Sequence, residues 1–283
     1  MQVHRVTNFY GEQSAEIVTS TGLTSPPMSV ASQEVVYAQL DGSMLLTRES
    51  DWQEAKLGRI FKATAIVPTA TTPTVISESL YVSHLGTHTD FCAKFAKIVT
   101  PYAPLQARLI FLTDGAVWIK NWVQAQYPDA TLILDYFHAA EYLHKWVEST
   151  FKDKVQRDIA CAECKKILLE QGIQPLITHL EATLIAHPTE SETKTVAQQK
   201  ILNYFIYNAF RMDYPTYRAN GWCIGSGAIE AAHRTVIQKR MKLSGQRWTK
   251  LNAQNMLNLR TANLSGKWHK VVALIRNHKP NAA

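Results

Sequence analysis

Residues 108–115, Arg-Leu-Ile-Phe-Leu-Thr-Asp-Gly, are the stretch that decides the fold class. The apolar run at 109–112 is typical of a buried strand, and the Asp114-Gly115 pair that follows ends it. A helical pattern comes next, from Val117 to the proline at 128. A buried strand followed at once by a helix is the repeating unit of α/β proteins, so this stretch predicts an α/β fold.

Short apolar runs elsewhere predict the other strands of the same sheet. A helix over 91–102 lies between two of these strands, a long helical region over 139–211 follows the last strand, and a last helix begins at Ala228. The order is therefore β-β-β-α-β-α-β, followed by helices. Residues 14–32 are rich in Ser and Thr and lack periodicity, so we expect residues 1–33 to be a linker or a loosely ordered arm. The other predicted strands are 35–40, 55–67, 78–83 and 131–134.

Composition limits the class of protein. With 283 residues, 46% hydrophobic and 19% charged, the chain is long enough for one large domain or two ordinary ones. No stretch approaches the ~20 apolar residues of a membrane span, so no membrane partner is expected. The four cysteines are too few and too scattered for a disulfide framework, which predicts a reduced, cytoplasmic protein.

Charge is concentrated at the C-terminal end. From Ile201 onward the chain has thirteen basic residues and two acidic ones, a net charge of +11. Because the whole chain carries +7, the first 200 residues sum to −4. A basic third on a mildly acidic body indicates a polyanionic partner, with nucleic acid first; a solvated basic face is the alternative.

Four carboxylates are the candidate chemical groups. Asp41, Asp114 and Asp135 each follow a predicted strand, where α/β proteins place their chemistry, although an Asp-Gly pair is also typical of a tight turn. Glu230 opens the last helix, where it could equally complement the helix dipole. Carboxylates that converge need cations between them, and oxygen ligands select Mg²⁺ or Mn²⁺. Two such ions clamp the oxygens of a phosphoryl displacement.

Several blocks of sequence together resemble the DDE transposases of bacterial insertion elements, specifically the Kra-type group related to Mutator-like transposases. The resemblance covers roughly residues 35 to 270. The segment 134–139 resembles the D-x-x-H motif of that superfamily, and the two C-terminal blocks are the most specific. The blocks are 40–42, 113–119, 134–139, 224–232 and 240–248.

The resemblance implies an RNase H-like catalytic core with a mixed five-stranded sheet and an all-helical insertion. The core would span about 34–149 and 222–283, the insertion about 150–215, and the catalytic domain 34–283. Asp41, Asp114 and Glu230 would be the catalytic, metal-binding triad, holding Mg²⁺ or Mn²⁺ as two ions. Asp135 and His138 match the accessory motif, which would orient other groups or contact DNA.

The resemblance also implies an activity and its partners. The enzyme would cleave DNA at element ends and transfer the strand to target DNA, as a homo-oligomer assembled on DNA. Members of the group usually carry a sizeable N-terminal region; only forty residues precede Asp41, which predicts a truncated transposase. An RNase H-like nuclease without strand transfer and a transposase-derived DNA-binding protein are the alternatives.

The basic third supplies the candidate DNA contacts. They follow Glu230 on or near the last helix, where basic side chains can reach phosphates and an aromatic ring can contact bases. A solvated helix face is the alternative for the charged residues. The candidates are Arg234, Lys239, Arg240, Lys242, Arg247 and Trp248.

Overall fold

The computed structural model describes residues 2–20, 34–68 and 74–277 as a mixed α/β protein. Its five-stranded mixed sheet has the strand order β5-β2-β1-β6-β7, so the predicted fold class and mixed sheet are confirmed. The chain forms two compact units. Of the described residues, the first unit contains 2–20, 34–68, 74–111, 117–131 and 227–277, and the second contains 112–116 and 132–226.

A long antiparallel hairpin is the centre of the first unit. β1 (Val36–Thr47) pairs with β2 (Asp51–Lys62), and β5 (Leu80–Leu85) pairs antiparallel with the other side of β2. The first strand was predicted to stop at Asp41, and that prediction is wrong, because β1 continues through Asp41 to Thr47. The hairpin turns later, and Asp51 there has a φ of 50°. A small ribbon of β3 (Ile66–Val67) and β4 (Val75–Ile76) follows η1 (Ala63–Ala65).

Helices cover both faces of this hairpin. Gly58 of β2 faces α2 (His88–Val99), and a Cβ atom added there would lie 2.5 Å from the Phe95 ring. Neighbouring residues of a strand point to opposite faces, so Leu57 faces the other layer. That layer contains α9 (Gly227–Ala232), η4 (His233–Gln238), α10 (Lys239–Met241) and α11 (Lys250–Leu264), whose buried apolar side chains pack on Leu45, Ala55, Leu57 and Tyr81.

The predicted helix from Ala228 to about Leu243 is present but contains a π-helical segment, η4. Wider π turns leave backbone carbonyls to be satisfied by other groups. Arg260 of α11 donates through its guanidinium to the carbonyls of Thr235 and Val236. The irregular segment is therefore held from the neighbouring helix.

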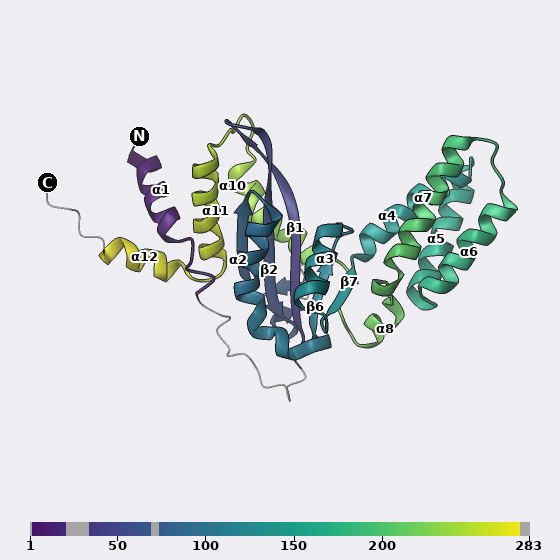
Figure 1. Ribbon diagram of the computed structural model, residues 1–283, viewed down its shortest axis with the longest axis horizontal. Coiled ribbons are helices and arrows are strands. Elements are labelled where there is room, and N and C mark those ends of the chain that lie inside the picture. Colours follow the sequence, from purple (N-terminus) through teal and green to yellow (C-terminus); the bar gives the residue numbers. More distant parts are fainter. Residues whose placement is uncertain (1, 21–33, 69–73, 278–283) are drawn as a thin grey trace. The chain divides into compact units, whose positions relative to one another are not determined.

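The N-terminal segment differs from the loosely ordered arm that the sequence predicted. Residues Gln2–Gln13 form α1, which packs on α11 (Figure 1). Gly11 makes this contact close, because a Cβ atom there would lie 2.5 Å from the Asn255 side chain, and its carbonyl accepts from Asn258 at 3.0 Å. Ile17 and Val18 are buried. The rest of the predicted arm, 21–33, lies outside the described residues.

The remaining elements of the first unit are mostly helical. η2 (Thr100–Arg108) leads into β6 (Leu109–Thr113), whose last two residues belong to the second unit. α3 (Val117–Gln126) ends just before Pro128, as predicted. α12 (Trp268–Asn277) packs on α11 and α1.

The second unit is a helical bundle attached to the strand β7 (Thr131–Leu134). Within it, α4 packs on α5 and α7, and α6 packs on α5 and α7, so each of the four helices contacts two of the others. Figure 1 shows α5, α6 and α7 running alongside one another. The predicted helical region is confirmed, with a break at Gly172, which has a φ of 96°. The helices are α4 (Tyr136–Thr150), α5 (Lys154–Glu170), α6 (Ile173–Ala186), α7 (Glu192–Asn208), η3 (Ala209–Arg211) and α8 (Tyr214–Ala219).

Candidate active site

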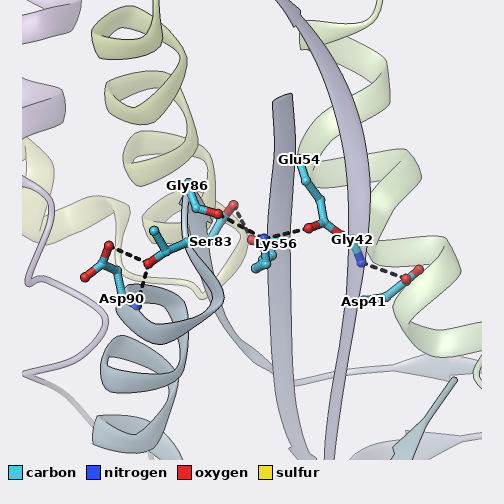
Figure 2. Close-up of polar contacts among 8 residues, drawn as sticks. Asp41, Gly42, Glu54, Lys56, Ser83, Gly86 and Asp90 are labelled. Carbon is cyan, nitrogen blue, oxygen red and sulfur yellow. Dashed lines mark hydrogen bonds and ion pairs between the residues drawn. The ribbon is translucent and has the colours of Figure 1, made fainter. Parts of the chain in front are cut away.

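Asp41 points to the face of the sheet that α9 and η4 cover. It lies directly opposite Leu57 in the β1–β2 register, and residues that pair in this way share a face. Leu57 is part of the apolar layer beneath α9 and η4. The Asp41 carboxylate accepts the Gly42 backbone N–H at 2.7 Å (Figure 2), and its side chain is 35% exposed. Asp41 is therefore a half-buried acid in mid-strand, not a turn residue.

His233 lies beside Asp41, and the sequence analysis missed it. Its Nε2 lies 3.4 Å from Asp41 Oδ2, but neither ring nitrogen has a hydrogen-bond partner among the described residues. Burial and the positive charge of Lys242 together lower the pKa of His233 to about 4, and the backbone of Asp41 opposes this only in part. The imidazole is thus neutral at pH 7, and its contact with Asp41 is not an ion pair.

Glu230 lies on the helix that packs over Asp41's face of the sheet. α9 contacts β1 and β2 through its buried residues Ile229 and Ala232, while Glu230 itself is exposed. The start of α9 is fixed by Arg59, whose Nη1 donates to the Ala228 carbonyl at 2.7 Å. Arg59 is itself buried. Asp41 and Glu230 therefore come from packed elements of one unit.

Lys56 forms a separate polar cluster on the opposite face of the hairpin. Its amino group lies 2.6 Å from Glu54 and donates to the Gly86 carbonyl at 2.9 Å (Figure 2). Glu54 crosses Gly42 to reach it, so a Cβ atom at Gly42 would lie 2.0 Å from the Glu54 carboxylate. This close approach, and not a turn, explains the Asp41-Gly42 pair.

Asp114 follows β6 and belongs to the second unit. Its Oδ1 accepts the Ala116 N–H at 3.0 Å, which shapes the turn after the strand. Tyr204 of α7 covers this turn: a Cβ atom at Gly115 would be 3.5 Å from Cε2 of its ring. Tyr204 in turn stacks on Tyr142 of α4, with ring centroids 3.6 Å apart. The bundle thus holds the Asp114 turn directly.

A buried arginine lies in the same part of the second unit. Arg211 is 0% exposed; its Nε and Nη2 donate to Asn208 Oδ1 at 3.0 and 2.6 Å, while Nη1 has no partner among the described residues. Burial lowers the pKa of Arg211, and Tyr204 and Asp114 oppose this. The Arg211 guanidinium therefore interacts electrostatically with the Asp114 carboxylate.

Asp135 accepts a hydrogen bond at each carboxylate oxygen, which supports a structural role. It is 1% exposed and caps α4: its Oδ1 accepts the Phe137 N–H at 2.9 Å, and its Oδ2 accepts the Ser226 hydroxyl at 2.5 Å. These bonds join the end of β7 to α4 and to the segment before α9. His138 is 42% exposed on its side chain and lies 3.7 Å from Glu141.

The predicted DNA-contact residues divide into two groups. Trp248 is anchored: its Nε1 donates to the Met241 carbonyl at 3.0 Å, and its backbone bonds Leu46 and Arg48 of the hairpin. The Arg240 guanidinium lies over its ring, 5.7 Å from the centroid. The charged candidates are exposed, and they are Arg234, Lys239, Arg240, Lys242 and Arg247.

The three proposed metal ligands are divided between the units. Asp41 and Glu230 are in the first unit and Asp114 is in the second. Across 2–20, 34–68 and 74–277, no group of three or more His, Cys, Asp or Glu side chains is arranged to hold a metal ion. The donor set itself, three carboxylates, has the oxygen chemistry that Mg²⁺ and Mn²⁺ prefer.

Comparison with known proteins does not assign a family. A scan against models of protein families gives no match, and a search of the curated proteins finds no similar sequence. Among the described helices, none combines the length and the apolar character needed to cross a membrane. The function must therefore be argued from the residues.

Proposed function

We propose that the chain is a DDE-type DNA transposase, which cleaves DNA at insertion-sequence ends and transfers the strand in a divalent-metal-dependent reaction. Asp41, Asp114 and Glu230 are the metal ligands of this proposal. The observation that carries it is the β1–β2 register: Asp41 points to the face of the sheet on which α9, the helix of Glu230, packs. Two acids that are far apart in the sequence thus come from a strand and a helix that pack on each other.

The order of elements supports an RNase H-like core. Apart from the short elements η1, β3, β4 and η2, the chain runs β1, β2, β5, α2, β6, α3 and β7, which is the β-β-β-α-β-α-β order that the resemblance implies. Between β7 and α9 the described elements are all helical, which supports a helical insertion over about 150–215. β1 lies between β2 and β6 in the sheet, so Asp41 is on the central strand and Asp114 follows its neighbour.

The chain's own residues would have distinct tasks in this reaction. The three carboxylates would hold two Mg²⁺ or Mn²⁺ ions, which supply Lewis-acid stabilisation of the charge that develops on the phosphodiester. Arg59 holds the start of α9, and therefore the backbone next to Glu230, through the Ala228 carbonyl. Asp135 ties α4 to Ser226, immediately before α9. These contacts fix the backbone around the acids before substrate binds.

The exposed basic residues supply the proposed DNA-binding surface. Arg234, Lys239 and Arg240 lie on η4 and α10, directly after the helix of Glu230, and Lys242 and Arg247 follow them. Phosphate contacts of this kind position DNA without reading its sequence. The surface therefore supports delivery of a phosphodiester backbone to the acids, with element ends and target DNA as substrates.

The test is an assay of the purified chain on labelled DNA taken from the sequences that flank its own coding region, with Mg²⁺ or Mn²⁺. We expect cleavage followed by joining of the 3′ end to a target plasmid. Cleavage alone would indicate an RNase H-like nuclease without strand transfer. Binding alone would indicate a transposase-derived DNA-binding protein, and either result contradicts the proposal.

Three variants control this assay. Asp114→Asn and Glu230→Gln should lose cleavage while they retain salt-sensitive DNA binding, because the change removes a ligand charge and keeps the side-chain shape. Glu181→Gln, a change at an exposed glutamate of α6, should behave as the wild type. Equal activity in Asp114→Asn would refute the assignment of Asp114.

A further inference from the structure

We infer that His233 is a nitrogen ligand of the divalent cation that Asp41 holds, so that this site prefers Mn²⁺, Co²⁺ or Zn²⁺ to Mg²⁺. The inference rests on the proposed role of Asp41 as a metal ligand and names the metal chemistry of that site. Mg²⁺ selects oxygen donors, whereas imidazole suits the later divalent ions. One histidine beside Asp41 therefore changes the expected selectivity.

The separation of the two side chains has the geometry of two ligands. Nε2 of His233 and Oδ2 of Asp41 are 3.4 Å apart and do not form a hydrogen bond. Two atoms that each lie about 2.05 Å from a tetrahedral ion are about 3.3 Å apart. The observed distance is therefore too long for a good N–H···O bond and suitable for a shared cation.

The burial of His233 makes its missing partners significant. The residue is 4% exposed, and both of its ring nitrogens lack a hydrogen-bond partner among the described residues. A buried polar group left unbonded costs roughly 1–3 kcal/mol, so such groups are rare without a functional reason. A cation between His233 and Asp41 would satisfy one of the two nitrogens.

The surroundings provide an access route for an ion. The Asp41 side chain is 35% exposed, so an ion can reach the pair from solvent. Glu230 is exposed and lies three residues before His233; residues at this spacing lie on neighbouring positions of one helix side. Lys242, which donates to Ser43 at 3.1 Å, is the opposing charge and lowers the affinity for any cation. The Asp41–His233 pair is the preformed part of the site, and the described residues do not group Glu230 with it.

The experiment measures metal binding by the full chain without DNA. Calorimetric titration with Mn²⁺ and with Mg²⁺ compares the wild type with His233→Gln, and His179→Gln is the matched control because His179 is a half-buried histidine of α6, outside the proposed site. We expect His233→Gln to weaken Mn²⁺ binding at least tenfold and Mg²⁺ binding less than threefold. Wild-type Mn²⁺ affinity in His233→Gln would overturn the inference.

A second measurement decides the question even if His233→Gln does not fold. Pulsed electron paramagnetic resonance of Mn²⁺ bound to the wild-type chain detects coupling to a directly bonded nitrogen. We expect this coupling in the wild type and its loss in Asp41→Asn; a bound Mn²⁺ without nitrogen coupling overturns the inference. Nitrogen coupling without any DNA cleavage would instead contradict the proposed function and leave the metal site intact.

Discussion

Asp41 lies on β1 in the first unit and Asp135 directly follows β7 in the second, and their surroundings differ. Asp135 is 1% exposed, and both of its carboxylate oxygens accept hydrogen bonds, from Phe137 and Ser226. Asp41 is 35% exposed and lies beside His233, a buried imidazole with no hydrogen-bond partner among the described residues.

This difference supports a structural role for Asp135 and the proposed role of Asp41 as a metal ligand. The oxygens of the Asp135 carboxylate accept hydrogen bonds from a helix N-terminus and from a hydroxyl. These bonds stabilise the contact between the elements that they join. Asp41 instead lies beside the His233 imidazole, which has no hydrogen-bond partner among the described residues. Both residues follow a strand that the sequence predicted, and that position in the sequence does not distinguish their roles.

The largest expected effect compares the two acids in DNA cleavage. Asp41→Asn should lower the single-turnover cleavage rate by at least about 1,000-fold, equivalent to about 4 kcal/mol, because it removes a proposed ligand charge. Asp135→Asn keeps an acceptor for the Phe137 N–H and should lower it less than tenfold. Equal losses in the two variants would remove the distinction drawn between these acids.

The second effect is a pH dependence of stability in the first unit. The pKa of His233 is lowered from its usual 6.5 to about 4 in the folded chain, so between these values the unfolded chain binds more protons. Stability should therefore be lost as the pH falls from 6.5 to 4, by up to about 3 kcal/mol. Urea denaturation in EDTA measures this, and His233→Gln should show a flatter profile. A profile of wild-type steepness in that variant would show that other groups are responsible.

The third effect concerns the structural acid of the second unit. Asp135→Ala should reduce the free energy of unfolding by about 2 kcal/mol, because it removes a helix cap and the bond to the Ser226 hydroxyl. Asp153→Ala is the matched control: Asp153 caps α5 by accepting the Gln156 N–H, but it is exposed. That change should cost about 1 kcal/mol or less. Denaturation followed by circular dichroism compares the two, and a larger loss in Asp153→Ala would contradict the account.

The smallest effect concerns the basic surface. Arg247→Ala should weaken DNA binding a few-fold and reduce the slope of log K against log salt by about 1, as the loss of one phosphate contact does. Lys154→Ala, a change at an exposed lysine of the bundle, should leave the slope unchanged. Fluorescence anisotropy across salt concentrations gives both slopes. Identical slopes for wild type and Arg247→Ala would remove Arg247 from the DNA-binding surface.

The sequence predicted the buried elements well because their signals are local. The apolar runs at Leu109–Thr113 and Thr131–Leu134 are strands, and Val117–Gln126 is a helix. The Asp41-Gly42 pair led to the wrong prediction that the first strand ends there, because this dipeptide is typical of turns. Here the glycine serves a cross-strand contact with Glu54, which no local pattern reveals.

The missed features depend on contacts between distant parts of the chain. α1 is held by Asn252, Asn255 and Asn258 of α11, so its own sequence gave little indication of order. His233 has no motif around it and becomes significant only because β1 brings Asp41 against it. Its spacing three residues after Glu230 was the one signal that could have drawn attention to it.

The central proposal is that Asp41, Asp114 and Glu230 are ligands of the same divalent cations, and a Mn²⁺ titration of four proteins tests it most directly. Calorimetry on the wild type, Asp41→Asn, Asp114→Asn and Glu230→Gln should show one set of binding events that each substitution weakens by at least tenfold. Wild-type Mn²⁺ affinity in Asp114→Asn, with binding lost in Asp41→Asn, would show that the second unit contributes no ligand and would contradict the account.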